Sequence, residues 1–170
     1  MDDRRISIDE LRQQQQDNWP EMHAASKPAL LRFLRLSDYV LREGARTLQQ
    51  VNLLSAEFDV LAALRRQPPP HTISPTELCR ALLISSGGLT KVLYRLQDQQ
   101  LISRPNNPSD GRSLLVALTE TGKQRVEAAT VELMGLHHRQ INMLDDAEQD
   151  TLNTLLEKML QKAAERAAAN

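Results

Sequence analysis

The chain has 170 residues, of which 41% are hydrophobic and only 3% aromatic, so it suits one domain with appendages and a core of Leu, Ala, Val and Ile. No apolar run approaches the ~20 residues of a membrane span, and Met-Asp-Asp-Arg-Arg is not followed by an apolar signal region, so we expect neither membrane insertion nor secretion. A net charge of −1 excludes a uniformly basic protein, and a single cysteine excludes an internal disulfide and is typical of the cytoplasm.

The pattern of the first third of the sequence predicts helices. Residues 6–16 can form a short polar helix, which Trp19-Pro20 interrupts. From Pro28 to Gln50 apolar residues recur at helical spacing, and proline suits a first helical turn. We assign residues 1–54 to an extra N-terminal helix and a first dimerisation helix.

Three further helices are predicted in residues 55–99. Ser55 can cap the first, and the prolines 68–70 end it. Ser74-Pro75-Thr76-Glu77 combines a cap, a first-turn proline and a returning glutamate, so it begins a short second helix that reaches about Leu83. Ser85 or Ser86 caps the third, which ends near Gln99. Its apolar residues face inward and its polar residues outward, the inward set being Leu89, Val92, Leu93 and Leu96 and the outward set Thr90, Lys91, Tyr94 and Arg95.

A hairpin and two long helices complete the chain. Leu101–Arg104 and Ser113–Leu118 read as strands around a turn over Pro105–Gly111. Thr119 caps a helix to about Met143, in whose first turn Gly122 is tolerable. The segment 145–148, Asp-Asp-Ala-Glu, opens the last helix with a capping box.

The predicted fold class is therefore mainly α with a small β-wing (α+β). Residues 55–119 form a winged helix-turn-helix module, and residues 120–170 form C-terminal dimerisation helices. A helix sized for the major groove beside a basic loop sized for the minor groove indicates binding to double-stranded DNA. Between residues 80 and 112 there are five cations and two anions, so this region is locally basic. The terminal helices carry more apolar surface than the module can cover, which indicates a homodimer that reads a palindrome.

Several motifs resemble the MarR family of bacterial transcription regulators. The matching segments, in order along the chain, are Phe58–Leu61, Pro75–Leu78, Ser86–Lys91, Arg95-Leu96, Leu101–Arg104, Asp110–Ser113 and Leu118–Gly122. The resemblance implies an obligate dimer, with the helix from Ser86 in the major groove and Arg112 at the wing tip in the minor groove. It also implies repression of nearby genes, relieved by a small molecule or an oxidant.

The candidate DNA-binding residues lie on the third helix and the wing: Ser85, Ser86, Gly87, Thr90, Lys91, Tyr94, Arg95, Asn106, Asn107, Arg112 and Ser113. A solvated helix face is the alternative for the helical set, and a solubilising charge is the alternative for Arg112. The resemblance also allows Arg95 to pack or pair inside the module. Asp110 can brace the wing arginine through a bidentate pair.

A narrower resemblance is to the PecS-type, urate-responsive branch, through the segment 57–66 and an extra N-terminal helix with a tryptophan. It implies candidate ligand or coupling residues at Trp19, Asp59 and Arg104. The branch has a further arginine where this chain has Val92, which cannot pair with an anion, so one partner of urate is missing while a ligand site in the same place is still implied. Asp59 is either a surface carboxylate or a partner of Arg104, and Trp19 is either a packing anchor or a ligand-stacking residue.

Other chemistries are not indicated. Cys79 reads as a small buried apolar residue, with redox sensing as the alternative because Arg80 is adjacent. The four histidines have no metal-ligand spacing, and no catalytic set is present, so we expect neither a metal, nor a cofactor, nor an enzyme. We expect a cytoplasmic, ligand-responsive repressor with a small anionic or aromatic effector. The alternative is an architectural or protein-interaction module that lacks a sensor.

Overall fold

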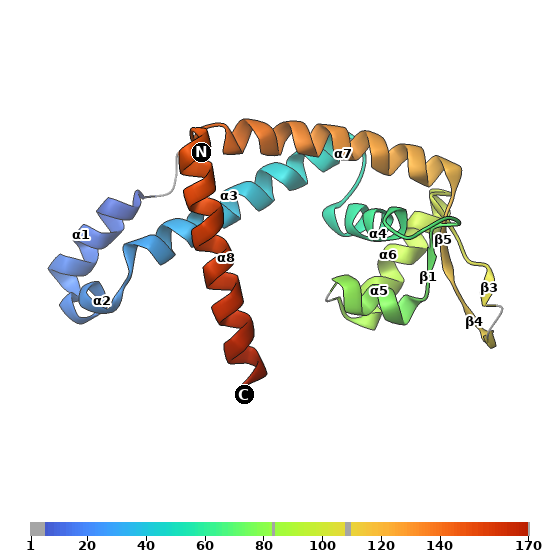
Figure 1. The fold of residues 1–170 in the computed structure, drawn as a ribbon, viewed down its shortest axis with the longest axis horizontal. Helices are drawn as coiled ribbons and strands as arrows, with labels where there is room; N and C mark the ends of the chain where they lie inside the picture. Colours follow the sequence, from blue (N-terminus) through green and yellow to red (C-terminus); the bar gives the residue numbers. More distant parts are fainter. Residues whose placement is uncertain (1–5, 83, 108–109, 170) are drawn as a thin grey trace. The chain divides into compact units, whose positions relative to one another are not determined.

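The computed structural model describes residues 6–82, 84–107 and 110–169, with the backbone alone for residues 110–113. Figure 1 shows the elements, and their mainly helical content with a small β-wing confirms the predicted fold class. In chain order they are α1 (Ile8–Asn18), α2 (Pro20–Ala25), α3 (Pro28–Gln50), α4 (Ser55–Arg65), β1 (Thr72–Ile73), α5 (Pro75–Leu82), α6 (Ser86–Asp98), β2 (Ile102–Ser103), β3 (Asn106–Asn107), β4 (Asp110–Leu114), β5 (Val116–Leu118), α7 (Glu120–Ile141) and α8 (Asp146–Ala168).

The chain packs as two compact units, Met1–Ala129 and Thr130–Asn170. The first unit comprises helices α1 to α6, the strands and the first turns of α7. The second holds the rest of α7 and all of α8. The sequence predicts a division of the chain by role into residues 1–54, 55–119 and 120–170. These boundaries differ from those of the two packed units, and they stay a prediction.

The helix starts follow the local sequence signals. At α5 the Ser74 hydroxyl accepts from the Glu77 amide at 3.2 Å, while the Glu77 carboxylate accepts from the Ser74 amide at 3.0 Å. At α8 Asp145 and Glu148 make the same reciprocal pair at 2.9 and 3.0 Å. Each box satisfies two amides that a helix otherwise leaves without a partner. Both predicted capping boxes are confirmed.

The start of α4 differs from the prediction. Ser55 is the first helical residue, and Leu54 occupies the cap position without a side-chain acceptor. The Leu54 amide donates instead to Glu57 Oε2 at 2.8 Å. The prediction of a Ser55 cap is wrong by one residue because Glu57 does the capping alone, from three residues further along.

The sheet has one strand that the sequence did not reveal. β1 and β2 both pair antiparallel with β5, in the order β1-β5-β2, so that Thr72 and Ser103 both lie opposite Ala117. The predicted strand over residues 113–118 is interrupted at Leu115. Residues 113–114 belong to β4, which begins at Asp110 and pairs with β3 as a separate hairpin that projects from the module in Figure 1. Both strands of this hairpin occupy part of the segment Pro105–Gly111, which was predicted as a turn. This hairpin is the wing.

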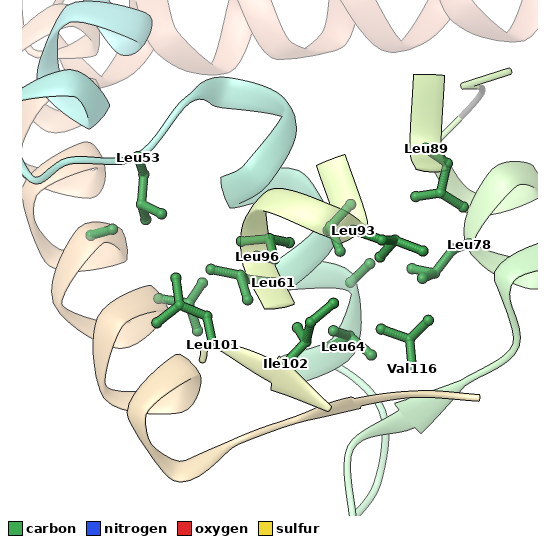
Figure 2. Packing of buried hydrophobic residues seen from close by; sticks show 14 of the residues in the cluster. Leu53, Leu61, Leu64, Leu78, Leu89, Leu93, Leu96, Leu101, Ile102 and Val116 are labelled. Atoms are coloured by element: carbon green, nitrogen blue, oxygen red, sulfur yellow. The ribbon is translucent and has the colours of Figure 1, made fainter. Parts of the chain in front are cut away.

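The core of the first unit is aliphatic, as the composition predicts. Figure 2 shows the side chains of α4, α5 and α6 converging on those of the sheet. The large apolar side chains with almost no exposed surface are Leu53, Val60, Leu61, Leu64, Leu78, Leu89, Leu96, Leu101, Val116 and Val126. Burying such a side chain stabilises the fold by roughly 1.5–3 kcal/mol relative to exposing it. Helix α6 is therefore fixed to the body by three buried leucines.

Gly122, which the sequence reading treats as merely tolerable, is required by packing. It lies in the first turn of α7 against the end of the turn before β2. A Cβ atom at this position would lie 2.0 Å from the Leu101 carbonyl oxygen and 2.9 Å from its carbon. Real Cβ atoms do not approach backbone so closely. The glycine thus sets the close contact between α7 and the module.

Candidate nucleic-acid interface

The N-terminus of α6 is an exposed, polar helix start. Ser85 has extended backbone and its hydroxyl accepts from the Gly88 amide at 3.2 Å, which confirms it as the cap. Ser85, Ser86 and Gly87 are all exposed. The partial positive charge of a helix N-terminus and its free amides attract phosphate oxygens. A Cβ at Gly87 would meet nothing within 4 Å, so the fold itself does not require glycine there.

The outward face of α6 is as predicted. Thr90, Lys91 and Tyr94 are exposed, Tyr94 to 67%, while the inward leucines are buried. The Thr90 hydroxyl donates to the Ser86 carbonyl oxygen at 2.8 Å, and its oxygen can still accept. Positions 87, 90, 91 and 94 lie along one side of a helix. The face offers one cation, hydroxyls and an amphipathic ring, which are suited to phosphates and thymine methyl groups.

Arg95 pairs inside the module, as the resemblance allows, with a partner that the sequence does not reveal. Its Nε atom lies 3.0 Å from Oε1 of Glu57, a carboxylate that is only 2% exposed, whereas the Arg95 side chain is 55% exposed. The N–H is not aligned for a hydrogen bond to Oε1, so the contact is a charge pair. Glu57 is an acidic residue in the first turn of α4, and its contact with Arg95 depends on a residue almost forty positions away. The pair attaches α6 to the start of α4.

The wing is described in its backbone and in part of its side chains. Asn106 is exposed and Asn107 half-buried, opposite Leu114 and Asp110 in the β3–β4 pairing. The predictions for the side chains of Asp110, Arg112 and Ser113 lie outside the described residues.

Arg104 secures the base of the wing. Its Nε atom donates to the Leu115 carbonyl oxygen at 3.1 Å, at the break between β4 and β5. In return the Leu115 amide donates to the Pro105 carbonyl oxygen at 2.8 Å. An arginine that bonds a backbone carbonyl in this way holds the two strands together where the regular ladder is interrupted.

The predicted bridge between Asp59 and Arg104 is wrong within this chain. The described residues form no ion pair between the two, because Arg104 bonds the wing backbone instead. Asp59 is exposed on α4. Even so, partial burial against its neighbours raises the pKa of its carboxyl above the ordinary 3.8, an effect that the nearby Arg66 charge opposes.

The other candidate ligand and redox residues are Trp19, Val92 and Cys79. Trp19, at the junction of α1 and α2, is 60% exposed, so the predicted anchoring of Trp19 on the body is not found within the chain. The α1–α2 hairpin is instead held by polar contacts, for example Arg12 to Ser26 at 3.1 Å. Val92 and Cys79 are half-buried and pack against the core. The packing of Cys79 agrees with its interpretation as a small apolar residue.

Among the described residues, no group of three or more His, Cys, Asp or Glu side chains could hold a metal ion. None of the helices in the described segments is both long enough and apolar enough to span a membrane.

The module matches a known family in sequence. The family model described as the MarR family matches residues 47–113. The multiple antibiotic resistance protein MarR of Escherichia coli is 35% identical over 115 residues, which are 66% of this chain and 77% of MarR. The transcriptional regulator PecS of Dickeya dadantii is 26% identical over 153 residues, covering 90% of this chain and 92% of PecS.

Solved structures agree. A variant of the E. coli protein complexed with operator DNA has a TM-score of 0.64 and 31% identity, over 78% of this chain and 96% of that one. BpsR of Bordetella bronchiseptica, whose DNA binding is described as regulated by 6-hydroxynicotinic acid, has a TM-score of 0.60 and 28% identity, over 74% and 90%. The PecS-type branch rests on lower identity than the family does, and it stays a prediction.

Proposed function

We infer the function of this chain from the fact that it belongs to the MarR family of helix-turn-helix transcription regulators, which are not enzymes. We propose that it acts in the cytoplasm as a homodimeric repressor that binds a pseudo-palindromic operator and releases it when a small effector binds. The observation that carries the proposal is the exposed polar face of α6 beside the wing, on a helix fixed to the body by buried leucines.

DNA contact by this face is supported by its chemistry. Gly87 leaves open space at the start of the helix, where a phosphate backbone can come close to free amides. Lys91 can contact a phosphate through its charge, and Tyr94 can contact DNA through its amphipathic ring. The E. coli relative has been solved with operator DNA, and the two chains are alike over nearly all of that protein.

Dimerisation is supported by apolar surface that each unit leaves uncovered. Within the second unit α8 buries none of its residues. Its apolar side chains Leu155, Met159 and Leu160 are 55–72% exposed. Leu144, Leu152 and Leu155 also line a shallow groove at the start of that helix. Within the first unit, Leu34 and other residues of α3 are exposed too. A second copy is the occupant that a two-fold operator reader needs.

An effector is supported less directly. BpsR, a relative at 28% identity, responds to a small aromatic acid. We therefore expect an anionic or aromatic compound, acting because it binds the DNA-bound and released states unequally.

The test is a binding titration with DNA from upstream of the gene that encodes this chain, repeated with small carboxylates, purines and phenolics. A saturable complex at nanomolar protein, released by one compound class, would support the proposal. Binding that depends steeply on salt but not on sequence would favour the architectural alternative instead.

A further inference from the structure

Glu57 is a buried carboxylate whose two oxygens face two different parts of the module. Oε2 accepts from the Leu54 amide at 2.8 Å, in the connector between α3 and α4. Oε1 is buried, makes no aligned hydrogen bond, and lies 3.0 Å from Arg95 Nε. A buried anion is costly unless a cation compensates it. Arg95 supplies that cation, and Glu57 in turn fixes where its guanidinium lies.

The rest of the Arg95 guanidinium points to a second use. The contact to Glu57 is made by Nε, at the base of the fork, and the side chain is 55% exposed. Among the described residues its two terminal amino groups make no hydrogen bond. Arg95 follows Lys91 by four positions, so both lie on one ridge of α6. A planar guanidinium held at its base offers two parallel donors, which match the oxygens of a phosphate.

We propose that Glu57 is a positioning residue, which holds Arg95 by its Nε atom so that the two terminal amino groups clamp a DNA backbone phosphate beside Lys91. This rests on the proposed function, since it assumes that α6 meets DNA. It assigns different roles to two neighbouring cations. Lys91 acts as a point charge, whereas Arg95 acts through the geometry of its fork.

The experiment exchanges the two cation types without changing the net charge. R95K and K91R are compared with the wild-type protein in anisotropy titrations against a mixed-sequence duplex about three helical turns long, at one salt concentration. R95K should bind roughly tenfold more weakly, because lysine cannot contact Glu57 and grip a phosphate with a fork. K91R keeps a cation that can bind a phosphate, so it should lose less affinity than R95K. Thermal melting confirms that each variant is folded at the assay temperature.

Glu57 is tested by its dependence on Arg95. E57Q removes one negative charge in any background, and glutamine can still accept from the Leu54 amide. It should weaken DNA binding when residue 95 is arginine, and should leave binding unchanged or stronger in R95K. An equal effect of E57Q in both backgrounds would overturn the positioning role. The double variants R95A/E57Q and R95K/E57Q should bind DNA with affinities that differ by no more than a few-fold.

The possible failures can be told apart. If R95K binds like wild type, the fork is not used and Arg95 serves only to neutralise Glu57. If E57Q does not fold, the comparison of R95K with K91R still decides the clamp. If the wild-type protein binds no duplex, the proposed function fails rather than this inference. As a control, R65A removes another cation, on α4, which pairs with Glu127 of α7, and DNA binding should not change.

Discussion

The contact between α7 and the module can be tested with a single methyl group at Gly122. The Gly122→Ala Cβ would lie 2.0 Å from the Leu101 carbonyl oxygen, whereas non-bonded heavy atoms sit about 3.5 Å apart, so the helix must move by more than about 1 Å. That movement breaks the bonds from the Thr119 amide to Leu101 (3.1 Å) and from the Thr119 hydroxyl to Gln100 (2.8 Å). Two lost hydrogen bonds and the overpacking, less the gain from replacing a helical glycine, give a net destabilisation of about 2–4 kcal/mol.

The assay is urea denaturation followed by circular dichroism, at one protein concentration because a dimer's stability depends on it. The matched control is Gly87→Ala, also in a first helical turn but with nothing within 4 Å of the new methyl group. The control should be as stable as wild type or up to about 1 kcal/mol more stable. Equal stability of Gly122→Ala and wild type would refute the packing argument, as would equal losses in both variants.

Three other predictions concern DNA binding and pH. Gly87→Ala should keep its stability but weaken DNA binding by tenfold or more, since the methyl group occupies the space that the DNA backbone needs; unchanged affinity in an anisotropy titration would mean that α6 does not approach DNA closely. Arg112→Ala should cost about 1–3 kcal/mol of operator affinity at fixed salt, and no loss would remove the wing arginine from the interface. Asp59→Asn should be more stable than wild type at pH 7, because burial raises the pKa of this carboxyl and the folded state disfavours its charge. That advantage should fade as the pH falls through the raised pKa and vanish below the ordinary 3.8, where both side chains are neutral; a constant difference in urea midpoints across this range would contradict it.

The sequence alone predicts those features of the fold whose signals lie among neighbouring residues. The capping boxes at residues 74–77 and 145–148 lie within one helical turn, and the structure has both. Pro28 begins α3 as predicted. The alternation of leucines and polar residues on α6 predicted its buried and exposed faces, because a helix with a fixed period has fixed sides.

What the sequence could not predict depends on distant partners. β1 has two residues and exists because β5 lies beside it, so no local pattern reveals it. Arg104 was assigned to Asp59 by resemblance, but the break in the strand at Leu115 offers it a carbonyl oxygen. Glu57 caps α4 within one helical turn, but its contact with Arg95 joins two helices far apart in the sequence.

The most direct test of the account is a DNase footprint of the wild-type protein on the DNA upstream of its own gene. We expect one protected region with two related half-sites, whose centres lie about one helical turn or a multiple of it apart, as two copies of α6 in a dimer require. Protection should weaken in R95K and Gly87→Ala. Uniform protection without a boundary, or none at concentrations that bind the mixed-sequence duplex, would contradict the claim that this chain reads an operator.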